Sequence, residues 1–218
     1  MTARKGQSRN SPMEHFKKAD PLLYKAALPH HAEITGTHRR GYPKDDLFAK
    51  LAGSIVSQQL STKAADTIWE RLKEACKGSV TPEAITRLRL PTMRKAGLSG
   101  AKSKTLKELS RAILTGDLDL ASLRKLPEED AIAKLSQVWG IGKWTAEMFL
   151  MFALDRKDIF SPGDLGLLRA MEQIYGIPPN SKIHVYEAIA VKWSPHRSFA
   201  CRVLWRVRDV PSPKSMGA

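Results

Sequence analysis

The stretch Val138-Trp139-Gly140-Ile141-Gly142-Lys143-Trp144-Thr145-Ala146 decides how this chain folds. Apolar residues that recur at helical spacing up to Val138 predict the end of one helix, and Thr145–Leu154 predicts a second one. Gly140 and Gly142 stand between them, and they give two points where the backbone is free to take a positive φ angle. The stretch therefore predicts a helix, a tight glycine turn and a second helix.

Such a turn is suited to holding a phosphate group. With no Cβ at Gly140 or Gly142, a phosphate can approach the backbone, and the free N–H groups at the start of the second helix point toward it. Lys143 and Thr145 lie at that start and complete the candidate phosphate site. An ordinary helical corner is the alternative, because a Gly-x-Gly turn alone is weak evidence of binding.

A carboxylate follows the second predicted helix. Asp164 comes after Pro162-Gly163 and before apolar residues at helical spacing, so it stands at an N-cap position. One interpretation makes Asp164 only a cap. The other makes it a carboxylate that the helix N-terminus keeps ionised and presents to bound DNA.

These stretches resemble a known family. Val138–Ala146 resembles the helix-hairpin-helix of the base-excision DNA glycosylases, and Pro162-Gly163-Asp164 resembles the Gly/Pro-rich loop and aspartate that name this HhH-GPD superfamily. Further stretches resemble its 3-methyladenine DNA glycosylase II type, which removes alkylated bases; they are Ile55–Ser61, Gly97-Leu98-Ser99 with Lys102 and Lys104, and Trp193–Ser198. The resemblance covers residues 44–207.

The fold is predicted to be all-α, because no segment alternates polar and apolar residues over a sustained length. The resemblance implies two helical lobes with a helix-hairpin-helix motif and a DNA-binding cleft between them. The middle lobe would span residues 44–156, with the hairpin at 128–154. The second lobe would join residues 1–43 with 157–218 and carry Asp164.

Local signals predict where several helices begin and end. We expect a first helix over Met13–Ala27 and a loop from Leu28 to Pro43. Ser61 and Thr81-Pro82 are expected to begin helices, and Gly97 is expected to end one.

The chain is strongly basic, with 36 Lys and Arg against 22 Asp and Glu, a net charge of +14 and a pI near 9.9. This balance indicates a polyanionic partner, although ribosomal and membrane-surface proteins share it. Two runs contain basic residues and no acid, and they fit a phosphate-tracking surface or, alternatively, solvated helix faces. The runs are Arg87, Arg89, Arg94, Lys95, Lys102, Lys104 and Lys107, and Lys192, Arg197, Arg202, Arg206 and Arg208.

Cysteine and histidine usage limits the other classes. The only cysteines, Cys76 and Cys201, exclude a four-cysteine metal site, indicate a reducing compartment and are expected to be buried. The six histidines show no ligand spacing, so we expect no catalytic metal. No apolar run predicts a membrane span or a secretory signal, and we expect a cytoplasmic protein, beside the nucleoid if it is bacterial.

The resemblance also implies roles in base flipping, which requires a gap-filling side chain and an aromatic pocket. Gln59 or Leu60 would fill the gap, and the sequence does not separate them. Trp144 and Trp205 would line the pocket, with Met148 where relatives often carry another aromatic residue. For both tryptophans the alternative is an ordinary place in the core.

The reaction implied is hydrolysis of the N-glycosidic bond of alkylated purines such as 3-methyladenine in double-stranded DNA, with Asp164 stabilising positive charge on the sugar. No cofactor is required and a monomer is expected. Relatives can hold Na⁺ or K⁺ on hairpin carbonyls, which by position are those of Ser136, Val138 and Ile141. Bifunctional relatives carry a nucleophilic lysine where this chain has Trp144, so no strand cleavage is expected.

Two other classes fit part of these features. A non-catalytic helix-hairpin-helix module would account for the charge and the glycine turn but would not require Asp164. A small basic RNA- or ribosome-associated helical protein would account for the charge alone. Release of a methylated base from DNA distinguishes the enzyme from both.

Overall fold

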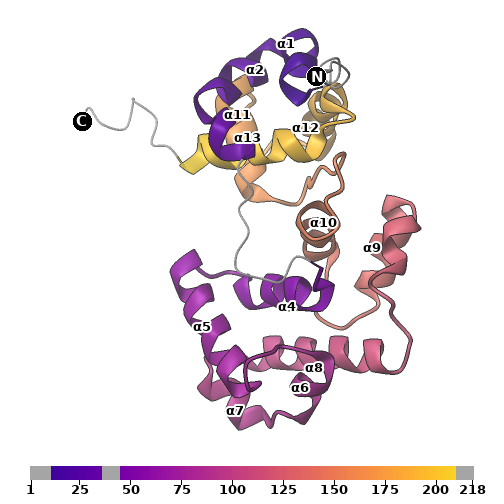
Figure 1. Ribbon diagram of the computed structural model, residues 1–218. Helices are drawn as coiled ribbons and strands as arrows, with labels where there is room; N and C mark the ends of the chain where they lie inside the picture. Colours follow the sequence, from indigo (N-terminus) through magenta and orange to yellow (C-terminus); the bar gives the residue numbers. More distant parts are fainter. Residues whose placement is uncertain (1–10, 36–44, 210–218) are drawn as a thin grey trace, which may run out of the picture. The chain divides into compact units, whose positions relative to one another are not determined.

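The computed structural model describes residues 11–35 and 45–209, and these ranges contain helices and no β-strand. The predicted all-α fold is therefore confirmed. The described residues divide into two compact units (Figure 1). Residues 45–155 form one, here called the central unit, and residues 11–35 with 156–209 form the other, the terminal unit.

In the central unit, most contacts between helices involve α8 or α4. Helices α6 and α7 pack on α8, while α4 contacts α5, α8 and α10, and α9 pairs with α10 (Figure 1). The core is made of fully buried side chains such as Leu51, Ile55, Leu106 and Phe149. The elements are α4 Leu47–Ser57, α5 Thr62–Ala75, α6 Pro82–Arg87, α7 Leu90–Lys95, α8 Gly100–Leu114, η2 Ser122–Lys125, α9 Glu128–Ser136 and α10 Lys143–Phe152.

The terminal unit is built from two segments far apart in sequence. Helix α11 packs along α13, and α2 from the N-terminal segment contacts both (Figure 1). Phe16, Leu23 and Trp193 are fully buried where these segments meet. The elements are α1 Pro12–Ala19, α2 Pro21–Ala27, η1 Leu28–His30, α3 His31–Thr35, α11 Leu165–Tyr175, α12 Ile183–Ala190, η3 Val191–Trp193 and α13 Arg197–Asp209.

The prediction of one helix over Met13–Ala27 was wrong, because the helix is interrupted at Asp20 and the structure has α1 and α2 instead. Asp20 has φ −151° and ψ 80°, and its side chain accepts the N–H of Leu23 and so caps α2. Pro21 follows at the first helical position, where it cannot continue the hydrogen bonds of α1. The other carboxylate oxygen of Asp20 accepts the Tyr175 hydroxyl at 2.7 Å and Trp193 Nε1–H at 2.8 Å, which ties three segments of the unit together.

The loop predicted from Leu28 to Pro43 was also partly wrong. The chain continues as η1 and α3 to Thr35, and residues 36–43 lie outside the described ranges. Proline in the first turn of η1 fits the sequence Leu28-Pro29, since its fixed φ favours helical backbone.

The predicted helix ends are confirmed. Ser61 Oγ accepts the N–H of Ala64 at 3.3 Å, and Thr81 Oγ1 accepts that of Ala84 at 3.2 Å. Gly97 follows α7 with a φ of +103°, a left-handed conformation that ends a helix. Cys76 and Cys201 are free and buried, as expected.

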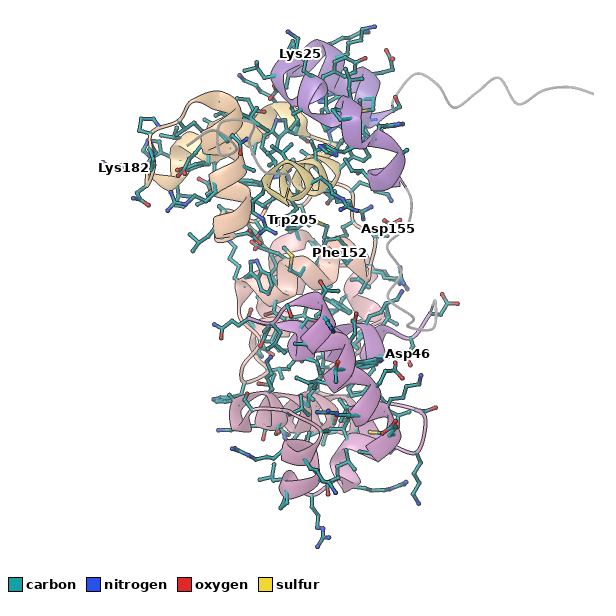
Figure 2. All side chains as sticks on the ribbon, turned by 90° about the vertical axis from the view of Figure 1, so that its left-hand side faces the viewer. Lys25, Asp46, Phe152, Asp155, Lys182 and Trp205 are labelled. Atoms are coloured by element: carbon teal, nitrogen blue, oxygen red, sulfur yellow. The ribbon has the colours of Figure 1, made fainter. Side chains whose placement is uncertain are left out.

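Basic side chains stand on the surface of both units. Lys25 and Lys182 are exposed on the terminal unit (Figure 2). In the part of the chain that the structure describes, none of the helices combines the length and the apolar character needed to cross a membrane.

Candidate functional site

The glycine turn begins where α9 ends. The N–H of Ile141 donates to the carbonyl of Val138 at 3.0 Å and closes a four-residue turn with Gly140 in its third position. Gly140 has a φ of +84°, and a Cβ there would lie 2.0 Å from the hydroxyl oxygen of Thr105 on α8. Both the backbone conformation and the close approach of α8 therefore require glycine at 140.

Gly142 is glycine for a different reason. Its φ is −90°, so the positive angle that glycine permits is not used at this residue. A Cβ there would meet nothing within 4 Å. Gly142 is the N-cap of α10, and its carbonyl accepts the first helical hydrogen bond, from Ala146 at 3.0 Å. The space beside it is open at a helix N-terminus, which is where an anion binds.

Lys143 and Thr145 differ in what they offer a phosphate. The Lys143 side chain is 69% exposed, and its ammonium lies 3.9 Å from the carboxylate of buried Glu147. Thr145 is buried, and its hydroxyl oxygen accepts a hydrogen bond from Gln58 Nε2 at 2.9 Å. Thr145 therefore offers a phosphate its backbone N–H in the first turn of α10 rather than its hydroxyl.

Trp144 and Met148 share one face of α10, since they are four residues apart on a helix. Trp144 is 38% exposed, whereas Met148 is buried. An indole that remains accessible beside the hairpin suits a stacking role, whereas Met148 belongs to the core of the central unit. Trp205 lies on α13 of the terminal unit and is half-buried (Figure 2).

The resemblance assigns a monovalent cation to three carbonyls, that of Ser136 at the end of α9 and those of Val138 and Ile141 in the turn. The Val138 oxygen already accepts the N–H of Ile141 and keeps one further lone pair. The cation stays a prediction. Across residues 11–35 and 45–209, no group of three or more His, Cys, Asp or Glu residues could hold a metal ion.

The candidates for the gap-filling side chain lie in an exposed turn between α4 and α5. The N–H of Leu60 donates to the carbonyl of Ser57 at 3.2 Å, and Gln59 has a φ of +55°. Gln59 and Leu60 are both exposed, Leu60 by 39%. Both can reach a partner outside the unit, so the two alternatives stay open.

Two lysines of the predicted phosphate-tracking run have other roles. Lys102 Nζ donates to the carbonyls of Val56 and Gln58, and Lys107 Nζ donates to those of Thr86 and Leu88. Burial lowers the pKa of both ammonium groups. Charge counting along the sequence missed this, because the carbonyl partners are more than fifteen residues away in the chain.

Trp139 is a candidate that the sequence analysis did not select. It precedes Gly140, is 46% exposed, and has the ammonium of Lys104 above its ring, 4.1 Å from the centroid. Lys104 and Thr105 are adjacent on α8, so one helix both packs on the turn and places a cation beside it. The sequence signal that could have identified Trp139 is its position directly before Gly140.

Asp164 lies at the start of α11 in the terminal unit. Its N–H donates to the carbonyl of Ser161 at 3.1 Å and closes a turn with Pro162 and Gly163 in the middle. Its carboxylate Oδ1 accepts the N–H of Leu167 at 3.0 Å, so the predicted N-cap is confirmed. The indole N–H of Trp205 approaches the same oxygen at 3.4 Å. Among the predicted site residues, these two are brought together.

Arg208 belongs to the second basic run, but the sequence analysis did not predict that it lies beside Asp164. A Cβ added to Gly166 would lie 2.3 Å from Arg208 Nη1 and 3.0 Å from Asp164 Oδ1. The guanidinium and the carboxylate therefore flank the same glycine at the start of α11. Glycine at 166 leaves room for this arrangement, and the sequence offered no signal for it.

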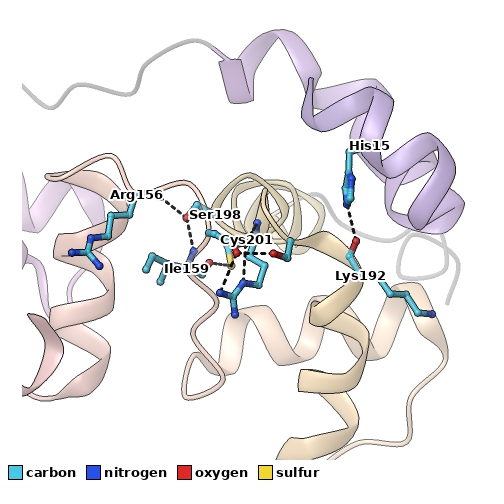
Figure 3. A network of polar contacts seen from close by, with 9 residues as sticks. His15, Arg156, Ile159, Lys192, Ser198 and Cys201 are labelled. Atoms are coloured by element: carbon cyan, nitrogen blue, oxygen red, sulfur yellow. Dashed lines mark hydrogen bonds and ion pairs between the residues drawn. The ribbon is translucent and has the colours of Figure 1, made fainter. Parts of the chain in front are cut away.

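The segment that leads to Asp164 is fixed by the stretch Trp193–Ser198. Ser198 donates its hydroxyl proton to the carbonyl of Arg156 at 2.6 Å, and its oxygen accepts the N–H of Ile159 at 3.0 Å (Figure 3). Cys201 Sγ contacts the Ile159 carbonyl at 3.6 Å (Figure 3). These contacts hold residues 156–159 against α13.

An ion pair strengthens this anchor. Arg197 donates through Nε and Nη2 to the two carboxylate oxygens of Asp158, at 2.9 and 3.2 Å, and Ser194 donates to Asp158 at 2.7 Å. Burial raises the pKa of the Asp158 carboxyl, but the hydrogen bonds from Arg197 and Ser194 outweigh it and hold that pKa below its ordinary value. Arg197 is thus structural rather than part of a phosphate surface.

The sequence and the fold of this chain are similar to those of known proteins. Residues 52–195 match the model of the HhH-GPD superfamily of base excision DNA repair proteins. The chain is 31% identical over 180 residues to DNA-3-methyladenine glycosylase 1 of Schizosaccharomyces pombe, covering 80% of this chain and 78% of that protein.

Two solved structures are similar over nearly their whole length. A DNA-3-methyladenine glycosidase from Bacillus halodurans has a TM-score of 0.76 and 31% identity, covering 93% of this chain and 91% of that one. A 3-methyladenine DNA glycosylase of Schizosaccharomyces pombe in complex with abasic DNA has a TM-score of 0.77 and 28% identity, covering 90% of this chain and 96% of that one.

Proposed function

Because the chain belongs to the HhH-GPD superfamily of base excision DNA repair proteins, we propose that it is a DNA glycosylase that excises alkylated purines, 3-methyladenine among them, from double-stranded DNA. The observation that carries the proposal is the carboxylate of Asp164, which caps α11 beside the indole of Trp205. A DNA-binding module needs the hairpin, but it does not need a carboxylate beside an aromatic ring.

Asp164 would act on the sugar rather than on the base. In the hydrolysis, the bond between C1′ and the purine nitrogen breaks with its electron pair leaving on the base, and water adds to C1′ and releases a proton. An alkylated purine is already a good leaving group, so the main requirement is to stabilise positive charge that grows on the deoxyribose. An ionised carboxylate supplies that stabilisation and can orient the water.

The hairpin would hold the DNA backbone during this reaction. Phosphate contacts fix the position and register of a protein on DNA without selecting a base. The open N-terminus of α10 at Gly142 and the exposed Lys143 side chain provide such contacts. Lys104 above Trp139 adds a cation next to the turn.

Selection of an alkylated base would fall to the indoles of Trp144 and Trp205. Alkylated purines are electron-poor and often cationic, and a cation on an indole face gains roughly 0.5–2 kcal/mol. Met148 is buried on the same face of α10 as Trp144, so this face of the helix would offer a base fewer aromatic groups than in relatives with another aromatic residue there.

The enzyme is proposed to be monofunctional. The position where bifunctional relatives carry a nucleophilic lysine holds Trp144, and Lys143 lies one residue earlier, about 100° around the helix. Water is then the nucleophile, and the product is an intact abasic site.

Incubation with methylated duplex DNA tests this function. We expect release of free 3-methyladenine, product strands that stay uncut until alkali is added, and no covalent adduct when borohydride is present during turnover. Binding without base release would favour the non-catalytic module. An adduct that disappears in Lys143→Ala would show that the enzyme is bifunctional.

A further inference from the structure

The turn that follows α4 has an uncommon backbone conformation. Gln58 has φ −50° and ψ 128°, Gln59 has φ +55°, and the Leu60 N–H donates to Ser57. This is the pattern of a type II turn, whose third position favours glycine. A residue with a Cβ is strained in that position, and the conformation persists only if the surrounding structure holds it.

Lys102 holds the turn from one side. It lies in the first turn of α8, and its Nζ donates to the carbonyl of Val56 at 2.8 Å and to that of Gln58 at 2.7 Å. The last carbonyls of a helix lack helical partners, and a cation at a helix C-terminus is stabilising. One ammonium therefore caps α4 and fixes Gln58, the second residue of the turn.

Gln58 holds the turn from the other side. Its Nε2 donates to Thr145 Oγ1 at 2.9 Å, and Thr145 is buried in the first turn of α10. The backbone N–H groups of that same helical turn are those that the hairpin offers to a phosphate. Gln58 thus links the turn between α4 and α5 to the start of α10 through side chains alone.

We propose that Lys102 and Gln58 are positioning residues that fix the exposed side chains of Gln59 and Leu60 relative to the phosphate held by the hairpin. The proposal rests on the proposed function, because only an enzyme that flips a base needs a side chain to fill the gap. Flipping costs free energy, because the base must be unpaired and unstacked. A side chain held at a set distance from the gripped phosphate meets the gap without first being ordered, and it offsets part of that cost.

If Lys102 positions the gap-filling side chain, the loss of release rate in a Lys102 variant should depend on how hard the base is to flip. A mispaired base is extruded at lower cost than a paired one. Single-turnover release is to be measured for 7-methylguanine opposite cytosine and for the same lesion mispaired opposite adenine. For Lys102→Met, we expect the paired rate to fall about ten-fold, equivalent to about 1.4 kcal/mol, and the mispaired rate to change by less than about three-fold.

Lys107→Met is the matched control. Lys107 is also a partly buried lysine on α8 that donates to two carbonyls, but those carbonyls end α6 and lie outside the turn. Its substitution should affect folding as Lys102→Met does, yet leave the ratio of paired to mispaired rates unchanged. Lys102→Arg keeps a cation that can donate to both carbonyls and should restore the ratio.

Gln58→Leu provides an independent test should Lys102→Met not fold. It removes the hydrogen bond to Thr145 and should lower the same ratio. The positioning role would be overturned if the release rate fell equally on both duplexes. It would also be overturned if Lys107→Met changed the ratio of paired to mispaired rates as much as Lys102→Met does. Absence of release by the unmodified protein from either duplex would instead count against the proposed function.

Discussion

Two glycines two residues apart are required for different physical reasons. A methyl group at Gly140 would have to occupy the space of the Thr105 hydroxyl on a backbone with positive φ. Gly140→Ala should therefore lower the free energy of unfolding by about 1–3 kcal/mol, as measured by urea denaturation.

Gly142→Val is the companion substitution. The space beside Gly142 is open, so this variant should fold with nearly the parental stability. Its side chain would obstruct the approach of a phosphate, and DNA affinity should fall for damaged and undamaged duplex alike. Normal DNA affinity in a folded Gly142→Val protein would contradict the role assigned to the turn.

Some residues could be assigned from sequence and others could not. The N-caps at Ser61, Thr81 and Asp164 follow from local rules, because a cap bonds to an N–H three residues away. The contacts of Lys102 join residues more than forty positions apart, and no local pattern encodes them. The break at Asp20-Pro21 carried a local signal, a cap followed by proline, that the apolar spacing obscured.

At the scale of elements, the contact between the segment 156–159 and α13 should respond to pH. The pKa of Asp158 is held below its ordinary value, so its stabilising contribution is present above the pKa of the unfolded chain, about 3.9. That contribution is lost as the pH falls through the lower pKa of the folded state.

Asp158→Asn measures this contribution. Near neutral pH, the free energy of unfolding of the variant should be lower than that of the parent by on the order of 1 kcal/mol, because a charge-assisted pair with Arg197 is lost. The difference from the parent should shrink below about pH 4. A difference that stays constant down to about pH 2 would show that the carboxylate charge contributes nothing.

Helix α10 shows how one element can serve two purposes. Its exposed start at Gly142 and Lys143 faces solvent, while Thr145, Glu147 and Met148 are buried in the central unit. The candidate phosphate-facing residues could be proposed from the sequence, since glycines and a lysine at a helix start are a local feature. It did not predict that the Thr145 hydroxyl is engaged by Gln58, because that contact spans 87 positions.

At the scale of the whole molecule, the net charge of +14 predicts DNA affinity that falls steeply with salt. Lys143→Ala should weaken binding to all duplexes and reduce the slope of log affinity against log salt by about one. Affinity measured by fluorescence anisotropy across a salt series checks this. A loss restricted to one lesion would contradict a phosphate contact.

The central claim is that Asp164 performs the chemistry, and Asp164→Asn tests it most directly. Asparagine keeps the shape and can still cap α11 through its side-chain oxygen, so the fold and DNA binding should remain. Single-turnover release of 3-methyladenine from duplex DNA should fall by about 100-fold or more, the scale of losing a preorganised electrostatic group. Release at the parental rate would show that Asp164 is only a helix cap.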